Sequence, residues 1–169
     1  MTKEKPGTLN LLIGSVGAGK TTFAGRRIAR TPAVFLDLDA CMVRLYGNDT
    51  RPSENVIDWY FERRERCRGL LWDVAGMVLS SGGDVFLELG LVTVAEREEF
   101  YSTSRSEEFK MIVYLLDAPR AVRRERVAER NRSAGPHTQI VPSEFFERAS
   151  DAWQHPTEAE RAAWSIIDV

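Results

Sequence analysis

The residues best suited to chemistry form a glycine-rich segment close to the N-terminus. Residues 14–21 read Gly-Ser-Val-Gly-Ala-Gly-Lys-Thr, which fits the phosphate-binding pattern G-x-x-x-x-G-K-[ST]. Glycines let consecutive backbone N–H groups turn toward an anion, and the N-terminus of a following helix adds partial positive charge. We expect Lys20 to lie between the β- and γ-phosphates of a nucleotide and the Thr21 hydroxyl to bind Mg²⁺. The predicted nucleotide site consists of Gly14, Ser15, Val16, Gly17, Ala18, Gly19, Lys20, Thr21 and Thr22.

A phosphate-binding loop has to join a strand to a helix, and the flanking residues fit that requirement. A largely apolar run, residues 9–13, precedes the loop, and a helix-compatible run, residues 22–29, follows it. Proteins that read guanine usually carry a separate Asn-Lys-x-Asp string, and this sequence has none. The sequence therefore predicts binding of ATP together with Mg²⁺.

Three carboxylates follow other predicted strands, and they are candidates for the chemistry beside the phosphates. Asp37 and Asp39 are two residues apart, so in an extended segment both would face the γ-phosphate. One such carboxylate can accept the proton of an attacking hydroxyl, and another can organise the metal. We assign the base to Asp39 and the metal to Asp37 or Glu88, although Asp39 also stands where it would cap the next helix. Glu88 could be an ordinary strand-end residue facing solvent, but its neighbours Leu87 and Leu89 are apolar, and burying a lone charge is costly.

A second basic feature lies in the C-terminal half. Six arginines fall between residues 120 and 132, and a polar segment without helical periodicity follows. A basic helix that leads into such a segment fits a lid, residues 120–141, which closes over phosphates and excludes water. Arg130 and Arg132 lie nearest the polar segment and are the predicted phosphate clamps. The other arginines of this helix are assigned to surface ion pairs.

Residues 40–81 are the predicted acceptor-binding region. Trp59, Tyr60 and Arg63 are the candidates to line that pocket, and packing or surface roles would explain them as well. The arginine-rich stretch 63–68 is assigned to a solvated helix face because Glu62 and Arg66 have the spacing of an ion pair on one helix.

Short apolar runs alternate with longer amphipathic ones, which is typical of a parallel sheet covered by helices. The expected strands are residues 9–13, 34–38, 84–89, 110–116 and 164–168, and the expected helices are 22–29, 40–45, 56–79, 94–104, 120–130 and 142–153. The predicted fold is an α/β three-layer P-loop sandwich with a five-stranded parallel sheet. Ligands of such sheets bind beyond the carboxyl ends of the strands, where the candidate residues lie.

Composition narrows the choice of partner. The chain has 169 residues, which fits one domain spanning 1–169, and its net charge of −2 gives no general attraction for nucleic acid or anionic membranes. No apolar run reaches the length of about 18 residues that suggests a membrane helix, so we expect a cytoplasmic protein without a membrane partner. The two cysteines suggest neither a disulfide framework nor a metal site.

With these residues in view, the chain resembles the small P-loop kinase-like proteins of the AAA-type ATP-binding group. This group includes polynucleotide 5′-hydroxyl kinases, chloramphenicol phosphotransferase, gluconate kinases and zeta toxins. The resemblance implies a shikimate/adenylate-kinase-like fold, an aspartate base at the end of the second strand and lid arginines that hold phosphates. Two residues depart from the pattern: Glu88 stands where the family usually has aspartate, and Met42 stands where phage-type polynucleotide kinases have arginine. The matching segments are residues 36–39, 86–91, 95–97, 116–119, 130–131 and 155–158.

The sequence predicts a P-loop kinase that transfers the γ-phosphate of Mg·ATP to a hydroxyl of a small molecule. In this scheme Lys20, Asp39, Arg130 and Arg132 are the catalytic residues. One alternative is a polynucleotide 5′-hydroxyl kinase, which the resemblance favours and the two departures weaken. The other is a nucleotide-dependent binding or switch protein without transfer activity. The sequence does not specify an oligomeric state.

Overall fold

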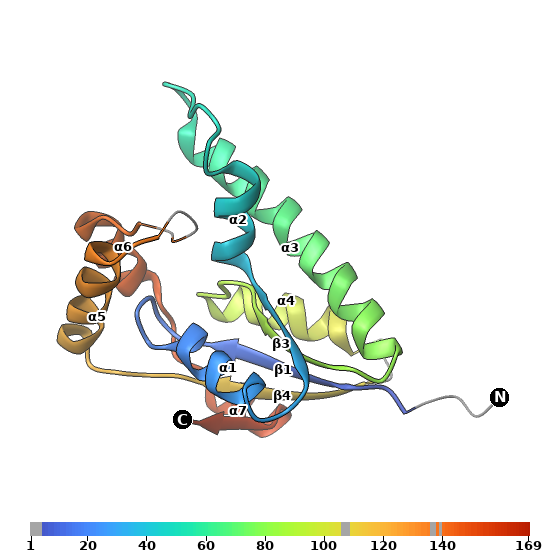
Figure 1. The fold of residues 1–169 in the computed structure, drawn as a ribbon. Helices are drawn as coiled ribbons and strands as arrows, with labels where there is room; N and C mark the ends of the chain where they lie inside the picture. The colour runs from blue at the N-terminus through green and yellow to red at the C-terminus, as the bar shows by residue number, and fades with distance from the viewer. Residues whose placement is uncertain (1–4, 106–108, 136–137, 139) are drawn as a thin grey trace.

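The computed structural model describes residues 5–105, 109–135, 138 and 140–169 (Figure 1). The strands are β1 (Thr8–Ile13), β2 (Ala33–Asp37), β3 (Asp84–Glu88), β4 (Lys110–Leu115) and β5 (Ile166–Asp168). The helices are α1 (Lys20–Ile28), α2 (Leu38–Tyr46), α3 (Val56–Ser80), α4 (Val94–Ser104), α5 (Arg120–Arg132), α6 (Ser143–Ala152) and α7 (Glu158–Ala163).

The strands form one parallel sheet in the order β2-β3-β1-β4-β5. The central strand β1 pairs on both sides, with Leu11 opposite Leu87 of β3 and Val113 of β4. All strands run the same way, so their carboxyl ends lie at one edge of the sheet. The predicted fold class, a P-loop α/β sandwich with five parallel strands, is confirmed.

Alternation along the strands separates two hydrophobic cores. Leu9, Leu11 and Ile13 of β1 belong to the core beneath α3 and α4, whereas Leu12 belongs to the core beneath α1. Successive side chains of a strand point to opposite faces, so one apolar strand supplies both cores. The helix layers thus hold the sheet between them and fix the strand ends that carry the site.

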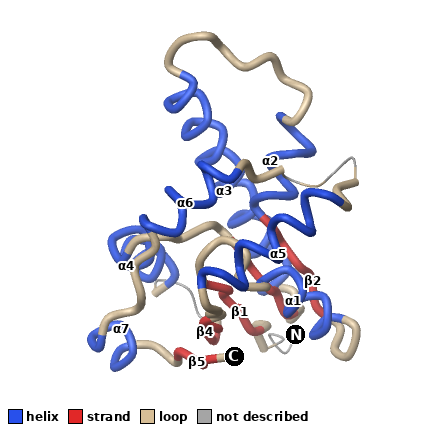
Figure 2. Tube along the Cα trace, turned by 90° about the vertical axis from the view of Figure 1, so that its left-hand side faces the viewer, coloured by secondary structure: helices blue, strands red, loops and turns tan. Residues whose placement is uncertain are grey.

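A third, smaller core joins α5, α6 and the glycine-rich loop. Val127 of α5, Val141 and Phe146 of α6 are buried together, and Val16 packs against them. In Figure 1, α5 and α6 lie on one side above the strand ends, and α2 with the first half of α3 rises on the other side. Figure 2 shows the loop between α2 and α3 at the end of the molecule farthest from the strands.

Near the C-terminus the structure contains a helix that the sequence analysis missed. Thr157 and Glu160 form a capping box at the start of α7, a signal that is readable in the sequence. Glu160 forms a buried ion pair with Arg97 of α4, with an Nε–Oε1 distance of 2.7 Å. The last strand begins at Ile166 rather than residue 164, because Trp164 ends α7 and stacks on Tyr101 instead.

In the described part of the chain, no helix combines the length and the apolar character required to cross a membrane.

Candidate functional site

The glycine-rich loop adopts backbone conformations that residues with a side chain rarely adopt. Gly14, Gly17 and Gly19 have φ angles of 146°, 77° and 107°, a region that other residues rarely adopt. A Cβ atom on Gly14 would also lie 2.2 Å from the backbone oxygen of Leu116, which is too close. The loop ends at Gly19, the N-cap of α1, and no side chain caps that helix. Its first N–H groups are therefore available to an anion, as the motif requires.

Lys20 lies across the mouth of this loop. Its Nζ donates hydrogen bonds to the backbone oxygens of Gly14, at 2.8 Å, and Ser15, at 3.1 Å, and lies 3.8 Å from Oε1 of Glu88. A phosphate in the loop would offer the ammonium a stronger partner than these carbonyls, since charged acceptors make shorter, stronger hydrogen bonds. The Lys20 ammonium is therefore placed to bind either the loop carbonyls or a phosphate.

The end of β2 differs from the prediction. Asp37, rather than Asp39, is the N-cap of α2: its Oδ1 accepts hydrogen bonds from the backbone N–H groups of Asp39, at 2.9 Å, and Ala40, at 3.2 Å. The strand stops at Asp37, so the expected extended segment is wrong and Asp39 lies in the first turn of the helix, exposed to solvent. Asp37 also receives a hydrogen bond from the Thr21 hydroxyl, with an oxygen–oxygen distance of 3.5 Å. The N-cap position therefore brings the Asp37 carboxylate to the loop residue Thr21, whereas the Asp39 carboxylate belongs to the first turn of α2.

Glu88 ends β3, directly opposite Asp37 in the sheet register. It is only 7% exposed, and its Oε1 accepts a hydrogen bond from the N–H of Gly90 at 3.1 Å. Burial raises the pKa of Glu88 to about 7; the Lys20 ammonium opposes this rise, and Asp39 and Asp37 add to it. The pKa of Asp37 is also raised, by burial first and then by Asp39. Negative charge is therefore crowded here and would be relieved by a bound cation.

These oxygens fit Mg²⁺ by type. Hydroxyl and carboxylate oxygens are the hard donors that Mg²⁺ prefers, and in nucleotide sites it usually takes one or two protein ligands beside phosphate and water. Among the described residues, no group of three or more histidine, cysteine, aspartate or glutamate side chains could hold a metal unaided. Thr21 and Asp37 form a pair of oxygen donors, and Glu88 lies opposite Asp37 on the neighbouring strand. This arrangement fits a metal that enters the site together with a nucleotide.

Two arginines of α5 contact the loop. The surface role assigned from the sequence is wrong for Arg123, which is buried, whereas Arg126 is exposed as expected. Arg123 is 7% exposed and donates to the Ser15 hydroxyl at 2.8 Å and to the Val16 carbonyl at 3.0 Å. Arg126 donates to the Ala18 carbonyl at 3.2 Å. They are three residues apart and share the helix face toward the loop. The three-residue spacing is visible in the sequence, but the sequence does not show that this face of the helix contacts the loop.

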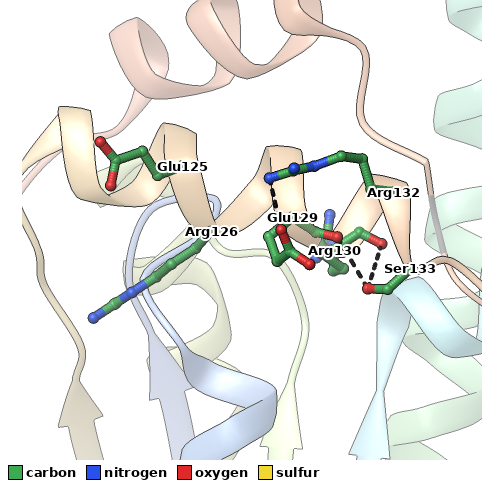
Figure 3. A pocket seen from close by; sticks show the side chains of 6 residues that line it. All are labelled: Glu125, Arg126, Glu129, Arg130, Arg132 and Ser133. Carbon is green, nitrogen blue, oxygen red and sulfur yellow. Dashed lines mark hydrogen bonds and ion pairs between the residues drawn. The ribbon is translucent and has the colours of Figure 1, made fainter.

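The two predicted clamps have different surroundings (Figure 3). Arg130 is partly buried, and its Nε and Nη2 atoms have no hydrogen-bond partner in the part of the chain that the structure describes. Arg132 has a side chain that is 74% exposed and pairs with Glu129 at 2.6 Å. The structure therefore brings Arg130, but not Arg132, in from the surface. Of the predicted lid, residues 136, 137 and 139 lie outside the described residues. An open hollow of about 730 Å³ is lined by Glu125, Arg126, Glu129, Arg130, Arg132 and Ser133.

Two arginines of α3 are held inward, so the solvated face predicted for 63–68 is wrong for them. Arg64 and Arg68 both donate to Oε1 of Glu96, at 3.2 Å and 2.9 Å. Both also donate to the Gly90 carbonyl, two residues after Glu88. Arg66 alone follows the prediction: it is exposed and pairs with Glu62. Charge pattern along one helix could not identify Glu96, which comes from α4.

The remaining acceptor candidates are Trp59, Tyr60 and Arg63 of α3. Burial, followed by the charge of Asp39, raises the pKa of Tyr60. The guanidinium of Arg63 lies over the Trp59 ring, 4.0 Å from its centre. Tyr60 packs against the main core, whereas Trp59 and Arg63 pack on each other.

A protein-family model described as an AAA domain matches residues 9–156. The chain belongs to this family. The matched span includes the loop, the carboxylates Asp37, Asp39 and Glu88, and the arginines of α3 and α5, and the predicted resemblance to P-loop kinase-like proteins is confirmed. A search of curated proteins gave no match.

Solved structures share the fold of this AAA domain. A chain of the Pnkp1/Rnl/Hen1 RNA repair complex has a TM-score of 0.67 at 16% identity over 96% of this chain, which spans 48% of that one. A gluconokinase from Sinorhizobium meliloti 1021 has a TM-score of 0.58 at 18% identity, covering 98% and 84%. Kti12 from Chaetomium thermophilum, in complex with ADP-AlF3, has a TM-score of 0.63 at 18% identity, covering 95% and 88%. At these identities the likeness shows a common fold, which is the P-loop fold of kinases.

Proposed function

We propose that this protein is an ATP-dependent phosphotransferase that moves the γ-phosphate of Mg·ATP to a hydroxyl group of a small molecule. The observation that carries the proposal is the position of three carboxylates beside a phosphate-binding loop: Asp37 and Glu88 at strand ends and Asp39 in the first turn of α2. A protein that only bound nucleotide would need the loop but no exposed carboxylate next to it. A transferase needs both.

On the nucleotide side, residues 14–22 bind the phosphates through backbone N–H groups, and Lys20 neutralises them. Thr21 and Asp37 would hold Mg²⁺, and Glu88 would support that site. When bound, Mg²⁺ supplies positive charge to the phosphate oxygens. Arg130 is the first candidate to contact the transferring group, because two nitrogens of its guanidinium have no hydrogen-bond partner among the described residues. Arg132 would have to leave Glu129 to assist it.

On the acceptor side, Asp39 accepts the proton of the attacking hydroxyl. Its exposed position in the first turn of α2 leaves the carboxylate accessible to a substrate. Catalysis then depends on positioning and charge neutralisation rather than on a covalent intermediate.

The polynucleotide 5′-hydroxyl kinase remains the second candidate, favoured by the match to a chain of an RNA repair complex. Against it, Met42 occupies the position where the resemblance expects a phosphate-binding arginine, and this methionine is 7% exposed within the main core. A gluconokinase has the same fold, so the fold accommodates a small acceptor equally well.

The test is ADP release from Mg·ATP across a panel of hydroxyl acceptors: sugars, nucleosides, antibiotics and 5′-hydroxyl oligonucleotides. We expect one small molecule to stimulate release and Asp39→Asn to lower that turnover at least about 100-fold, the usual contribution of a general base, while ADP affinity stays within about twofold. Stimulation by oligonucleotides alone would support the second candidate. Full turnover by Asp39→Asn would exclude Asp39 as the base, and ATP binding without any stimulated release would favour a switch protein.

A further inference from the structure

Arg123 is a buried cation that connects three separate segments of the chain. Its Nε donates to the Ala118 carbonyl at 3.0 Å, just before α5. Its Nη1 lies within 3.0 Å of oxygens of Ser15 and Val16 in the glycine-rich loop and of the Ser150 hydroxyl in α6. A planar guanidinium offers donors in fixed directions, so this arrangement sets the loop in relation to both helices.

Lys20 and Arg123 hold the loop from two sides. Lys20 donates to the backbone oxygens of Gly14 and Ser15, whereas Arg123 donates to the Ser15 side chain and to the backbone oxygen of Val16. Lys20 has to release those carbonyls when it turns to a phosphate. Arg123 contacts different atoms, so its hold on the loop does not depend on where Lys20 points.

The tip of the loop also packs directly on α5. A Cβ atom on Gly17 would lie 2.8 Å from the backbone oxygen of Arg123 and 3.0 Å from Cγ2 of Val127. The loop therefore has no room to shift toward α5, and the Arg123 hydrogen bonds keep it from moving away. The backbone of the loop is therefore held on both sides before any anion arrives.

We propose that Arg123 is a positioning residue that keeps the phosphate-binding loop in its anion-ready shape when the site is empty. This rests on the proposed function only in that the loop binds nucleotide phosphates. The benefit is preorganisation, because a loop that is already shaped has less conformational freedom to lose on binding. Arg123 acts through Ser15 and Val16, to which it donates hydrogen bonds.

Arg124 provides a matched control. It is the next residue of α5, it also lies over the Phe146 ring, and it pairs with Glu147 of α6 at 2.8 Å. Like Arg123→Gln, Arg124→Gln removes a cation that links α5 to α6. Among the described residues, it removes no contact with the glycine-rich loop.

The experiment compares wild type, Arg123→Gln, Arg123→Lys and Arg124→Gln in two measurements. Hydrogen exchange of the backbone amides in residues 14–19, without nucleotide, reports the shape of the loop, and calorimetric titration with Mg·ADP reports its affinity. We expect Arg123→Gln to speed exchange and to raise Kd by about tenfold or more, the size expected for lost hydrogen bonds from a charged group. Arg124→Gln should stay within about twofold of wild type, and Arg123→Lys should restore part of the loss, because lysine keeps the charge but not the fork.

Exchange and affinity that are equal in Arg123→Gln and Arg124→Gln would overturn the proposal. If Arg123→Gln does not fold, Arg123→Lys decides: loop exchange and Kd identical to wild type would also overturn it. The exchange measurement needs neither nucleotide nor acceptor. Faster loop exchange confined to the Arg123 variants, without acceptor-stimulated turnover in any protein, would support the positioning role while the proposed kinase activity fails.

Discussion

At the scale of residues, positive and negative side chains from different elements are paired. Glu96 is the clearest example. Its Oε1 accepts hydrogen bonds from Arg64 and Arg68, and its Oε2 accepts them from the N–H groups of Val92 and Thr93. Burial alone would raise the pKa of Glu96, but these hydrogen bonds and the two guanidinium charges outweigh it and lower the pKa to about 2. Both arginines also hold the Gly90 carbonyl, so one carboxylate fixes the segment that follows Glu88.

This pKa predicts how stability depends on pH. The pKa lies below the ordinary value of 4.5, so the stabilisation is present above pH 4.5 and is lost as the pH falls toward about 2. We expect Glu96→Gln to lower the free energy of unfolding at pH 7 by about 2 kcal/mol. The difference from wild type should shrink as the pH falls below 4.5. Urea unfolding between pH 7 and pH 3 measures this.

The control for that series is Glu62→Gln, which removes an exposed partner of Arg66 and should change stability by less than about 0.5 kcal/mol at any pH. A gap between Glu96→Gln and wild type that stays constant down to pH 3 would contradict the assignment.

At the scale of elements, the junction between β2 and α2 is decisive because one residue has two tasks. Asp37 ends the strand, caps the helix and meets the Thr21 hydroxyl. The cap determines where α2 begins, and this places Asp39 in the first turn rather than beside Asp37 on an extended strand. The geometry of the acceptor side thus follows from a capping interaction.

The two tasks of Asp37 can be separated by substitution. Asparagine caps a helix about as well as aspartate, whereas alanine does not. We expect Asp37→Ala to lose about 1 kcal/mol of stability and Asp37→Asn to lose less than about 0.5 kcal/mol. Both should weaken ADP binding by about tenfold or more in the presence of Mg²⁺, because each removes the charge at the metal, and neither should weaken it without Mg²⁺.

Urea unfolding and titration with ADP, each with and without Mg²⁺, measure the two effects. Mg·ADP affinity of Asp37→Asn equal to that of wild type would remove Asp37 from the metal site and leave Glu88 as the remaining acidic candidate.

At the scale of the whole molecule, the fold brings the loop, the carboxylates and α5 to one edge of a parallel sheet. The chain belongs to the AAA-domain family over residues 9–156, and structures with the same fold include a gluconokinase and a chain of an RNA repair complex. The net charge of −2 provides no general attraction for a polyanion.

Salt dependence separates the two acceptor classes. Binding of a polynucleotide releases counterions, so about three phosphate contacts would weaken binding by more than about tenfold between roughly 50 and 200 mM salt. For a small neutral acceptor we expect KM to change by less than about twofold over that range. Steady-state kinetics measure this, with KM for ATP as the internal control. A steep rise of acceptor KM alone would contradict the proposed small-molecule acceptor.

Much of the fold could be predicted from the sequence, because the signals were local. The loop pattern with its neighbouring apolar run, and the alternation of strands with helices, depend on residues close together in the chain. These signals placed β1 to β4 and α1 to α5 within a few residues and predicted the parallel sheet. The short helix α7 was missed although its capping box was readable, since six residues carry too little periodicity.

What the sequence by itself determined is the identity of the candidate groups: Lys20, Thr21, the carboxylates at positions 37, 39 and 88, and a basic α5. Only the tertiary structure decided which of the arginines face inward. Arg64 and Arg123 are buried and Arg68 is half-buried, each against partners from distant segments, whereas Arg132 remains at the surface. The physical reason is that burying a guanidinium requires acceptors, and those acceptors come from other elements that only the folded chain brings close.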